Sequence, residues 1–404
     1  MRFLFLCNKS PWPAHEGGPI AMNSLIQGLL KDGHQIKILA VNSDKYNVKI
    51  QDVPEDYIAK TGIELIHIDL DIKPVDAFLN LFTNKSYHVQ RFISKNFGQR
   101  LSEILQSESF DIIQFETIFM APYLEISRKY SKAKLILRAH NIEHLIWERL
   151  SKQGSNPLKK MYLRHLSCTL KYYEISMLKH FDGIAAITQS DGNFFRNHSN
   201  ISVIDLPFGI DLEKYNPNLA EPEFPSLFHL GSMNWIPNEE GIKWFLDEVW
   251  PLVHKNQPDL KLYLAGRYMP EWLMKSQLKN VIIVGEVADA QEFICSKSIA
   301  IVPLLSGSGI RIKIIEAMAL GKAVVSTSIG AEGIQIENGH NILIADEPSK
   351  MASAINQLVE DVFFTLKIGA NARVCIEEKY DNRKIIQKYC DWLNSNNNQK
   401  SETP

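Results

Sequence analysis

Short apolar runs rich in β-branched residues alternate with amphipathic stretches along almost the whole chain. This alternation is typical of βα units, in which helices connect the strands of a parallel sheet, so the expected fold class is α/β. In the first half, strands are expected at Arg2–Cys7, Gln35–Val41, Glu64–Ile68, Asp111–Phe115, Lys134–Ala139, Gly183–Ile187 and Ile201–Ile204. In the second half, they are expected at Leu227–Leu230, Lys261–Ala265, Val281–Val284, Ile299–Pro303, Ala323–Ser326 and Ile342–Ala345.

Length and turn-rich segments indicate two doubly wound domains. A chain of 404 residues is too long for one ordinary core. The segment Pro207–Asp211 and the proline-bearing stretch Pro217–Pro225 interrupt the alternation and predict a linker. Helices are expected at 21–32, 90–106, 157–180, 349–360, 363–378 and 381–394. The polar tail after Ser395 is expected to be disordered.

Composition excludes several classes of protein. A net charge of −2 gives no bias toward nucleic acid, so no nucleic-acid partner is expected. The 5 cysteines are scattered without a CxxC pair or metal-ligand spacing, which predicts a reducing compartment and no zinc site. The apolar N-terminal run is too short for a signal peptide, and no run reaches the ~18 apolar residues of a spanning helix. A cytoplasmic protein is expected.

The stretch Ser151–His180 indicates peripheral membrane contact. It carries several lysines and one arginine against the single acid Glu174, with tyrosines and leucines interleaved. A basic amphipathic helix of this kind can lie on an anionic membrane, here the inner face. The alternative is a solvated helix face over the core of the first domain.

Two features of the first half stand at strand ends, where ligands bind in open α/β sheets. Gly17 and Gly18 come ahead of an expected helix, and glycines there let backbone N–H groups approach an anionic ligand. His140 directly follows the expected strand Lys134–Ala139. The alternatives are a turn that glycine permits and a strand-end histidine that hydrogen-bonds to backbone.

Two further loops follow strands of the second half. Gly231 and Ser232, with Asn234 close behind, can admit a phosphate or a sugar to backbone contact. Arg267 follows the next strand and can pair with a phosphate. Taken one at a time, both loops are also ordinary βα turns.

The segment 301–325 carries the strongest signal. A strand is followed by the flexible loop Gly307-Ser308-Gly309-Ile310, and then by a helix that ends at Gly321. The loop presents N–H groups at a helix start, which forms an anion site. Arg311 and Lys313 add positive charge sufficient to hold a diphosphate without a metal. Glu316 lies in the most apolar part of the helix, where a carboxylate needs a partner, and a ribose diol would supply one.

The residues 316–325, Glu-Ala-Met-Ala-Leu-Gly-Lys-Ala-Val-Val, resemble the helix and following strand of retaining glycosyltransferases of the GT-B fold, family four (glycosyl transferases group 1). The Gly17-Gly18 loop, His140 and Gly231 fall in the order that this family shows. The resemblance covers nearly the whole chain. It implies two Rossmann-like domains facing a central cleft.

The resemblance also implies the division of the chain. Residues 1–207 would bind the acceptor, and residues 208–378 would bind the nucleotide sugar. The C-terminal helix, about 379–395, would join the first domain, and residues 396–404 would form the disordered tail.

Residue by residue, the resemblance implies how the donor is held. Glu316 would bind the ribose, Gly18 would place its N–H near the diphosphate or sugar, and His140 would contact the sugar near the reacting carbon. The base would lie beside the strand end at Val284–Val287, largely through backbone groups.

The chain departs from the family pattern at Ser308, where the family carries the first acid of a Glu-x7-Glu motif. A serine there alters donor choice or weakens the hold on the donor. The family's phosphate-binding Arg and Lys, near residues 231–241, are also missing here, where Lys243 is the only nearby base. Our hypothesis is that Arg311 and Lys313 have taken over that charge.

The resemblance therefore predicts a metal-independent hexosyltransferase that needs no cofactor. It would transfer a sugar from a UDP- or GDP-linked donor, with retention, to a glycan or lipid-linked acceptor in cell-surface polysaccharide or glycoconjugate synthesis. Two alternatives stay open. One is a sugar-nucleotide epimerase of the same fold, and the other is a catalytically inactive nucleotide-sugar-binding protein. A nicotinamide oxidoreductase is disfavoured because the GxGxxG fingerprint is missing.

Overall fold

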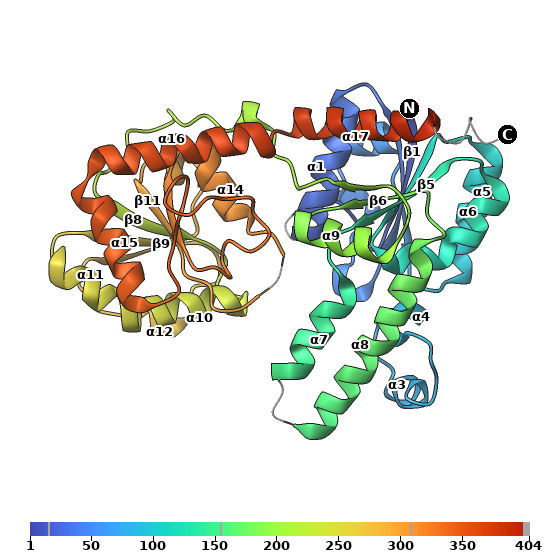
Figure 1. The fold of residues 1–404 in the computed structure, drawn as a ribbon, viewed down its shortest axis with the longest axis horizontal. Coiled ribbons are helices and arrows are strands. Elements are labelled where there is room, and N and C mark those ends of the chain that lie inside the picture. The colour runs from blue at the N-terminus through green and yellow to red at the C-terminus, as the bar shows by residue number, and fades with distance from the viewer. Residues whose placement is uncertain (15–16, 154–155, 308, 399–404) are drawn as a thin grey trace. The chain divides into compact units, whose positions relative to one another are not determined.

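The computed structural model describes residues 1–14, 17–153, 156–307 and 309–398. The chain divides into two compact units, each containing a parallel sheet with helices on its faces (Figure 1). Unit 1 comprises Met1–Gly209 together with the C-terminal segment from Ile385, and unit 2 comprises Ile210–Lys384. The architecture is therefore α/β with two Rossmann-like domains, as the alternating pattern predicts.

The sheet of unit 1 has seven strands in the order β3-β2-β1-β4-β5-β6-β7. Its strands are β1 (Arg2–Cys7), β2 (Gln35–Asn42), β3 (Glu64–His67), β4 (Ile112–Glu116), β5 (Lys134–Ala139), β6 (Gly183–Ala186) and β7 (Val203–Asp205). The strand order reverses between β1 and β4, which is where doubly wound folds bind ligands. The strands are apolar because helices cover both faces of the sheet.

The helices of unit 1 pack on three core clusters, one on each side of this sheet and a smaller one that joins Ala77, Tyr87 and Leu166. They are α1 (Gly17–Lys31), α2 (Glu55–Thr61), α3 (Pro74–Asn80), α4 (Tyr87–Gln90), α5 (Lys95–Ser107), α6 (Leu124–Tyr130), α7 (Glu143–Gln153), α8 (Pro157–Leu178) and α9 (Gln189–His198). The last helix, α17 (Asn382–Asn398), begins in unit 2 and continues into unit 1.

The sheet of unit 2 has six strands in the order β10-β9-β8-β11-β12-β13. Its strands are β8 (Ser226–Leu230), β9 (Lys261–Ala265), β10 (Val281–Gly285), β11 (Ile299–Val302), β12 (Ala323–Ser326) and β13 (Leu343–Ile344). Its helices are α10 (Ile236–Trp244), α11 (Trp250–Asn256), α12 (Glu271–Met274), α13 (Ala290–Cys295), α14 (Ile312–Ala319), α15 (Pro348–Glu360) and α16 (Val362–Lys379). Here the order reverses between β8 and β11.

Several element boundaries differ from the sequence expectation. Helix α1 begins at Gly17, so the glycine pair forms its first turn instead of preceding it; the N–H groups of a first turn have no partner within the helix. The expected helix 90–106 is two helices, because Ser94 caps α5 by accepting a hydrogen bond from the N–H of Phe97. Helix α17 continues to Asn398, so the disordered tail expected from residue 396 is wrong for 396–398, and 399–404 lie outside the described residues.

Candidate active site

The site of unit 2 is built around the ammonium group of Lys313, on the first turn of α14. This side chain is half-buried. Its Nζ donates a hydrogen bond to Oδ1 of Asn238 on α10 at 2.8 Å, and it lies 3.3 Å from Nε2 of His229 on β8. Three elements beside the reversal of strand order, β8, α10 and α14, thus converge on one cation.

His229 is held so that it can accept a hydrogen bond from Lys313. Its Nδ1 lies 2.9 Å from the carbonyl oxygen of Ile301, which can only accept, so this nitrogen carries the proton. Nε2 is then the acceptor that faces Lys313. Burial, followed by the nearby charge of Lys313, lowers the pKa of His229 well below its ordinary value, so the ring is neutral at physiological pH.

The charge of Lys313 is poised near neutral pH. Burial lowers its pKa to about 7; the positive charge of Arg311 adds to this effect, while Glu316 opposes it. A buried lysine in this state gains most from an anionic partner, because the anion removes the cause that disfavours the charged form. The arrangement therefore suits a phosphate or diphosphate beside Nζ.

Gly231 borders this ammonium group closely. A Cβ at position 231 would lie 2.4 Å from Nζ of Lys313 and 2.9 Å from Nε2 of His229, so a larger residue would collide with both. The carbonyl of Ser232 accepts a hydrogen bond from Nδ2 of Asn238 at 2.8 Å. Gly231 and Ser232 are thus brought together with Lys313.

Glu316 lies one turn along α14 from Lys313 and is half-buried. Its Oε1 accepts a hydrogen bond from the hydroxyl of Tyr215 at 3.0 Å. Burial raises the pKa of this carboxyl group, and the Tyr215 hydrogen bond and Lys313 act in the opposite direction. Tyr215 is the partner that a carboxylate in an apolar helix requires.

Arg311 supports the loop at residues 307–310 from within. Its side chain is buried, lies over the ring of Trp235 at 5.3 Å and donates a hydrogen bond to the carbonyl of Gly309. Gly307 and Gly309 have φ angles of 114° and 84°, a region that glycine adopts without strain. Ser308 lies outside the described residues, so the predicted effect of this serine stays a prediction.

The remaining predicted residues lie around this centre. Arg267 is exposed and pairs with Glu286, at 2.8 Å between Nε and Oε1. Asn234 is exposed and its Oδ1 accepts a hydrogen bond from the Ser232 hydroxyl. Val287 and Ile310 are half-buried.

In unit 1, His140 is the end of a buried chain of hydrogen bonds. Its Nε2 lies 2.5 Å from Oε2 of Glu116, at the end of β4. The other oxygen of Glu116 accepts from the amide of Gln114, and the carbonyl of that amide accepts from the hydroxyl of Tyr389 on α17 at 2.6 Å.

The positive charge of Arg138 and the contact with His140 keep Glu116 ionised although it is fully buried. Burial alone would raise the pKa of Glu116, but Arg138, 3.7 Å away, and His140 together lower it. Burial lowers the pKa of His140, with Glu116 opposing this shift. Nε2 of His140 donates to Glu116, so Nδ1 is the nitrogen left to face a ligand.

The side chain of Lys9 lies near the glycine pair Gly17 and Gly18 of unit 1. A Cβ added at Gly18 would lie 3.1 Å from Cε of Lys9, and the charge of Lys9 also acts on His140. The first turn of α1 and Lys9 therefore occupy one corner of unit 1 with His140. This is the corner that residue type and strand position predict as a ligand site.

Sequence reasoning missed Tyr215, His229, Asn238 and Glu116. His229 stands inside the expected strand Leu227–Leu230 and Glu116 directly follows the expected strand Asp111–Phe115, so a polar residue at a strand end was the available signal. Tyr215 lies within the predicted linker, between Pro207–Asp211 and Pro217–Pro225, and Asn238 lies in α10. Neither carries a local pattern, because only the folded sheet brings them to Glu316 and Lys313.

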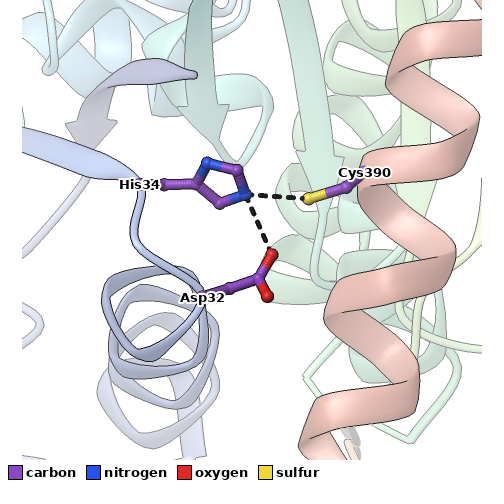
Figure 2. Close-up of side chains that lie close together, drawn as sticks. All are labelled: Asp32, His34 and Cys390. Carbon is purple, nitrogen blue, oxygen red and sulfur yellow. Dashed lines mark hydrogen bonds and ion pairs between the residues drawn. The ribbon is translucent and has the colours of Figure 1, made fainter.

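The spacing of the cysteines in the sequence does not predict one cluster of side chains. Figure 2 shows this cluster, which consists of Asp32, His34 and Cys390. Nε2 of His34 lies 3.1 Å from Oδ2 of Asp32 and 3.2 Å from Sγ of Cys390. Nδ1 of His34 faces the N-terminal amine at 3.0 Å. Burial raises the pKa of Cys390 to about 11, which keeps a proton on the thiol. The cluster therefore attaches α17 to unit 1 by hydrogen bonds.

Comparisons with known proteins agree with this fold. Residues 224–361 match the model of the family described as Glycosyl transferases group 1. A 44.6 kDa protein in the cps region of Klebsiella pneumoniae is 26% identical over 401 residues, covering 95% of this chain and 98% of that protein.

Solved structures resemble the chain over 98% of its length. HepE of Anabaena in complex with UDP has a TM-score of 0.65 at 16% identity, with 100% of that chain covered. Sucrose-phosphate synthase from Thermosynechococcus elongatus has a TM-score of 0.67 at 14% identity, with 99% of that chain covered. The chain thus has the two-domain GT-B fold of these structures, and the family match covers residues 224–361 within unit 2.

Proposed function

We propose that this protein transfers a sugar from a nucleotide-sugar donor, with retention of anomeric configuration, to a glycan or lipid-linked acceptor. The observation that carries the proposal is the half-buried Lys313 between His229 and Asn238, one turn from Glu316. A cation and a carboxylate at this spacing suit the two polar parts of a nucleotide sugar, its diphosphate and its ribose diol. The complex of HepE with UDP and the cps-region relative support a nucleotide-linked donor and polysaccharide synthesis.

The charge that develops on the leaving diphosphate defines the mechanism. Fixed cations and N–H groups aimed at that charge provide the largest catalytic effect in such reactions. Lys313 supplies the cation and the start of α14 supplies N–H groups, so the proposed reaction requires no metal. UDP- and GDP-linked hexoses are the donors to be tested.

His140 acts in the proposal on the donor sugar. Its Nδ1 contacts a hydroxyl near the reacting carbon, while Glu116 fixes the ring and compensates positive charge on it. Retention follows from attack on the face that the diphosphate leaves, with the diphosphate accepting the proton of the acceptor hydroxyl. Units 1 and 2 then serve the acceptor and the donor respectively.

A panel of UDP- and GDP-sugars tested by thermal shift examines this function. A ligand that binds only the folded state raises the melting temperature, by an amount that grows with its concentration above Kd. We expect one class of nucleotide sugar to raise it, and the product formed with an acceptor to keep the donor's anomeric configuration by NMR. A panel without any shift contradicts the proposal, and a changed sugar without transfer identifies an epimerase.

Replacing Tyr215 by phenylalanine is expected to weaken donor binding about tenfold, because one hydrogen bond to a charged group contributes ~1.5–3 kcal/mol. Without this donor, Glu316 is protonated more readily and accepts from a ribose less well. Calorimetric titration of the donor measures the effect. Tyr263→Phe is the control, since Tyr263 donates to Glu223 instead. Equal donor affinity of Tyr215→Phe and the natural protein would show that Glu316 does not depend on this hydroxyl.

A further inference from the structure

Three side chains that can ligate a metal ion meet at one ring nitrogen of His34. The carboxylate of Asp32 and the thiol of Cys390 both approach Nε2 of this ring, at 3.1 and 3.2 Å (Figure 2). The ligand atoms of the three residues all lie within 4.8 Å of one another. A carboxylate, an imidazole and a thiolate are each common ligands of zinc in proteins.

A relay of hydrogen bonds would arrange these groups differently. In a relay that activates a nucleophile, the carboxylate binds Nδ1 of the histidine and the nucleophile binds Nε2, on opposite sides of the ring. Here Nδ1 of His34 faces the N-terminal amine at 3.0 Å, and the carboxylate and the thiol share the other nitrogen. One N–H group cannot point straight at two acceptors, whereas a metal ion in front of Nε2 would contact oxygen, nitrogen and sulfur together.

The distances within the cluster are close to those of a tetrahedral zinc site. Zinc bonds of ~2.0–2.1 Å to nitrogen, ~2.0–2.2 Å to oxygen and ~2.3 Å to sulfur place the ligand atoms about 3.4–3.6 Å from one another. The two contacts of Nε2 therefore need to widen by only a few tenths of an ångström. The side chain of Asp32 is 49% exposed, which gives an ion a path of entry from solvent.

The cluster lies at the edge of the sheet opposite to His140. Asp32 and His34 stand between α1 and β2, at the amino end of β2, whereas His140 follows the carboxyl end of β5. Both strands belong to one parallel sheet. Cys390 comes from α17 and is separated from His34 by 356 residues. A metal site here is therefore separate from the residues of unit 1 that the transfer reaction would use.

We propose that Asp32, His34 and Cys390 bind one zinc ion, which fastens α17 to the turn between α1 and β2. Zinc suits this set because thiolate and imidazole are its preferred ligands, whereas magnesium and calcium prefer oxygen. Three protein ligands leave a fourth position for a water molecule. The expectation of no zinc site follows from cysteine spacing alone, and only the folded chain brings Cys390 to the other two residues.

Zinc binding requires that two protons leave the cluster. The S–H bond of Cys390 breaks and its proton passes to solvent, because the zinc ion compensates the charge of the thiolate. The ring proton of His34 moves to Nδ1 when Nε2 binds the metal, so the N-terminal amine beside Nδ1 releases a proton as well. Zinc affinity should therefore rise with pH.

Equilibrium dialysis of the untagged full chain against zinc tests the proposal, with the bound metal counted by mass spectrometry. We expect one zinc ion per chain, and a higher melting temperature in its presence, because the three ligands are brought together only in the folded state. Cys390→Ser should weaken zinc binding at least about a hundredfold, since the loss of a mere outer contact to a metal ligand already costs ~10–100-fold. Asp32→Asn, at a position open to solvent, should weaken it as well.

Cobalt(II) in place of zinc shows whether the sulfur binds. A cobalt–thiolate bond gives an intense charge-transfer absorption in the near ultraviolet, which the natural protein should show and Cys390→Ser should lack. A cobalt complex of the natural protein without this absorption contradicts the assignment of Cys390 as a ligand.

Two control variants separate this site from adventitious binding. Cys168→Ser removes an exposed cysteine, and Asp69→Asn removes a carboxylate from a group of three exposed aspartates. Both should bind zinc like the natural protein. Absence of bound zinc in the natural protein overturns the proposal, and so does zinc binding that Cys390→Ser and Asp32→Asn leave unchanged. The measurements use neither donor nor acceptor, so their outcome is independent of the proposed transfer reaction.

Discussion

Replacing Lys313 by methionine is expected to lower the transfer rate by about 10²–10³-fold, the effect of removing one fixed group that stabilises charge in a transition state. Donor affinity should fall as well, since Nζ is the cation of unit 2 that lies closest to Gly231 and His229. Methionine keeps most of the volume of the side chain, so the fold should remain. Steady-state kinetics and calorimetric titration of the donor measure the two effects.

Lys322→Met is the matched control for this substitution. Lys322 is a buried lysine of unit 2, whereas Lys313 is half-buried, and the Nζ of Lys322 donates to the carbonyl of Cys295 at 2.8 Å instead of facing the site. Any loss that follows from removing a buried ammonium group should appear in both variants, whereas the loss of transfer should appear only in Lys313→Met. If both variants bind and transfer like the natural protein, Lys313 does not hold the diphosphate.

Replacing His140 by alanine is expected to lower the transfer rate by about 10²-fold or more, with a smaller change in donor affinity. The reason is that the proposed contact of Nδ1 lies near the reacting carbon and strengthens as charge develops there. Glu116→Gln should lower the rate less, because the ring keeps a hydrogen-bond partner but loses the charge that stabilises it. Tyr389→Phe should have the smallest effect of the three.

A second buried histidine–glutamate pair provides the control. His144 and Glu174 lie 2.6 Å apart between Nδ1 and Oε2, but they join α7 to α8. His144→Ala should change the melting temperature more than the rate at a temperature where the protein is folded. A rate in Glu116→Gln equal to that of the natural protein would show that the hydrogen bond to Glu116 does not position His140.

The fold could be predicted from sequence because each βα unit carries its own local signal. Strands β1, β5, β9 and β12 have the expected bounds, since apolar runs end there at polar or turn residues. The expected strand Ile299–Pro303 ends at Val302 instead. Pro303 has no N–H to donate to a neighbouring strand.

The site could be predicted only in part, because its polar partners come from distant segments. The loop and helix at 307–316 carry a contiguous pattern, so Lys313 and Glu316 could be named from sequence. Their partners His229 and Tyr215 are separated from them by 84 and 101 residues. Sheet order, not sequence proximity, brings these groups together.

The structure also separates the roles of Arg311 and Lys313, which the sequence alone does not distinguish. The sequence treats them as two equivalent charges beside a loop. The structure separates them, because Arg311 donates to the carbonyl of Gly309 and packs on Trp235, while Lys313 faces His229 and Asn238. We therefore assign the diphosphate contact to Lys313 and the support of the loop to Arg311.

The central claim, that a donor diphosphate binds at Lys313, is tested most directly by proton uptake. With a pKa of about 7, Lys313 is mostly neutral at pH 8 in the free protein. An anion beside Nζ favours the charged form and raises this pKa, so binding takes up a proton. Calorimetric titration of the nucleotide sugar at pH 8, in two buffers of different ionisation enthalpy, measures the number of protons. We predict an uptake approaching one proton in the natural protein and none in Lys313→Met; equal uptake in both, or none in either, would contradict the account.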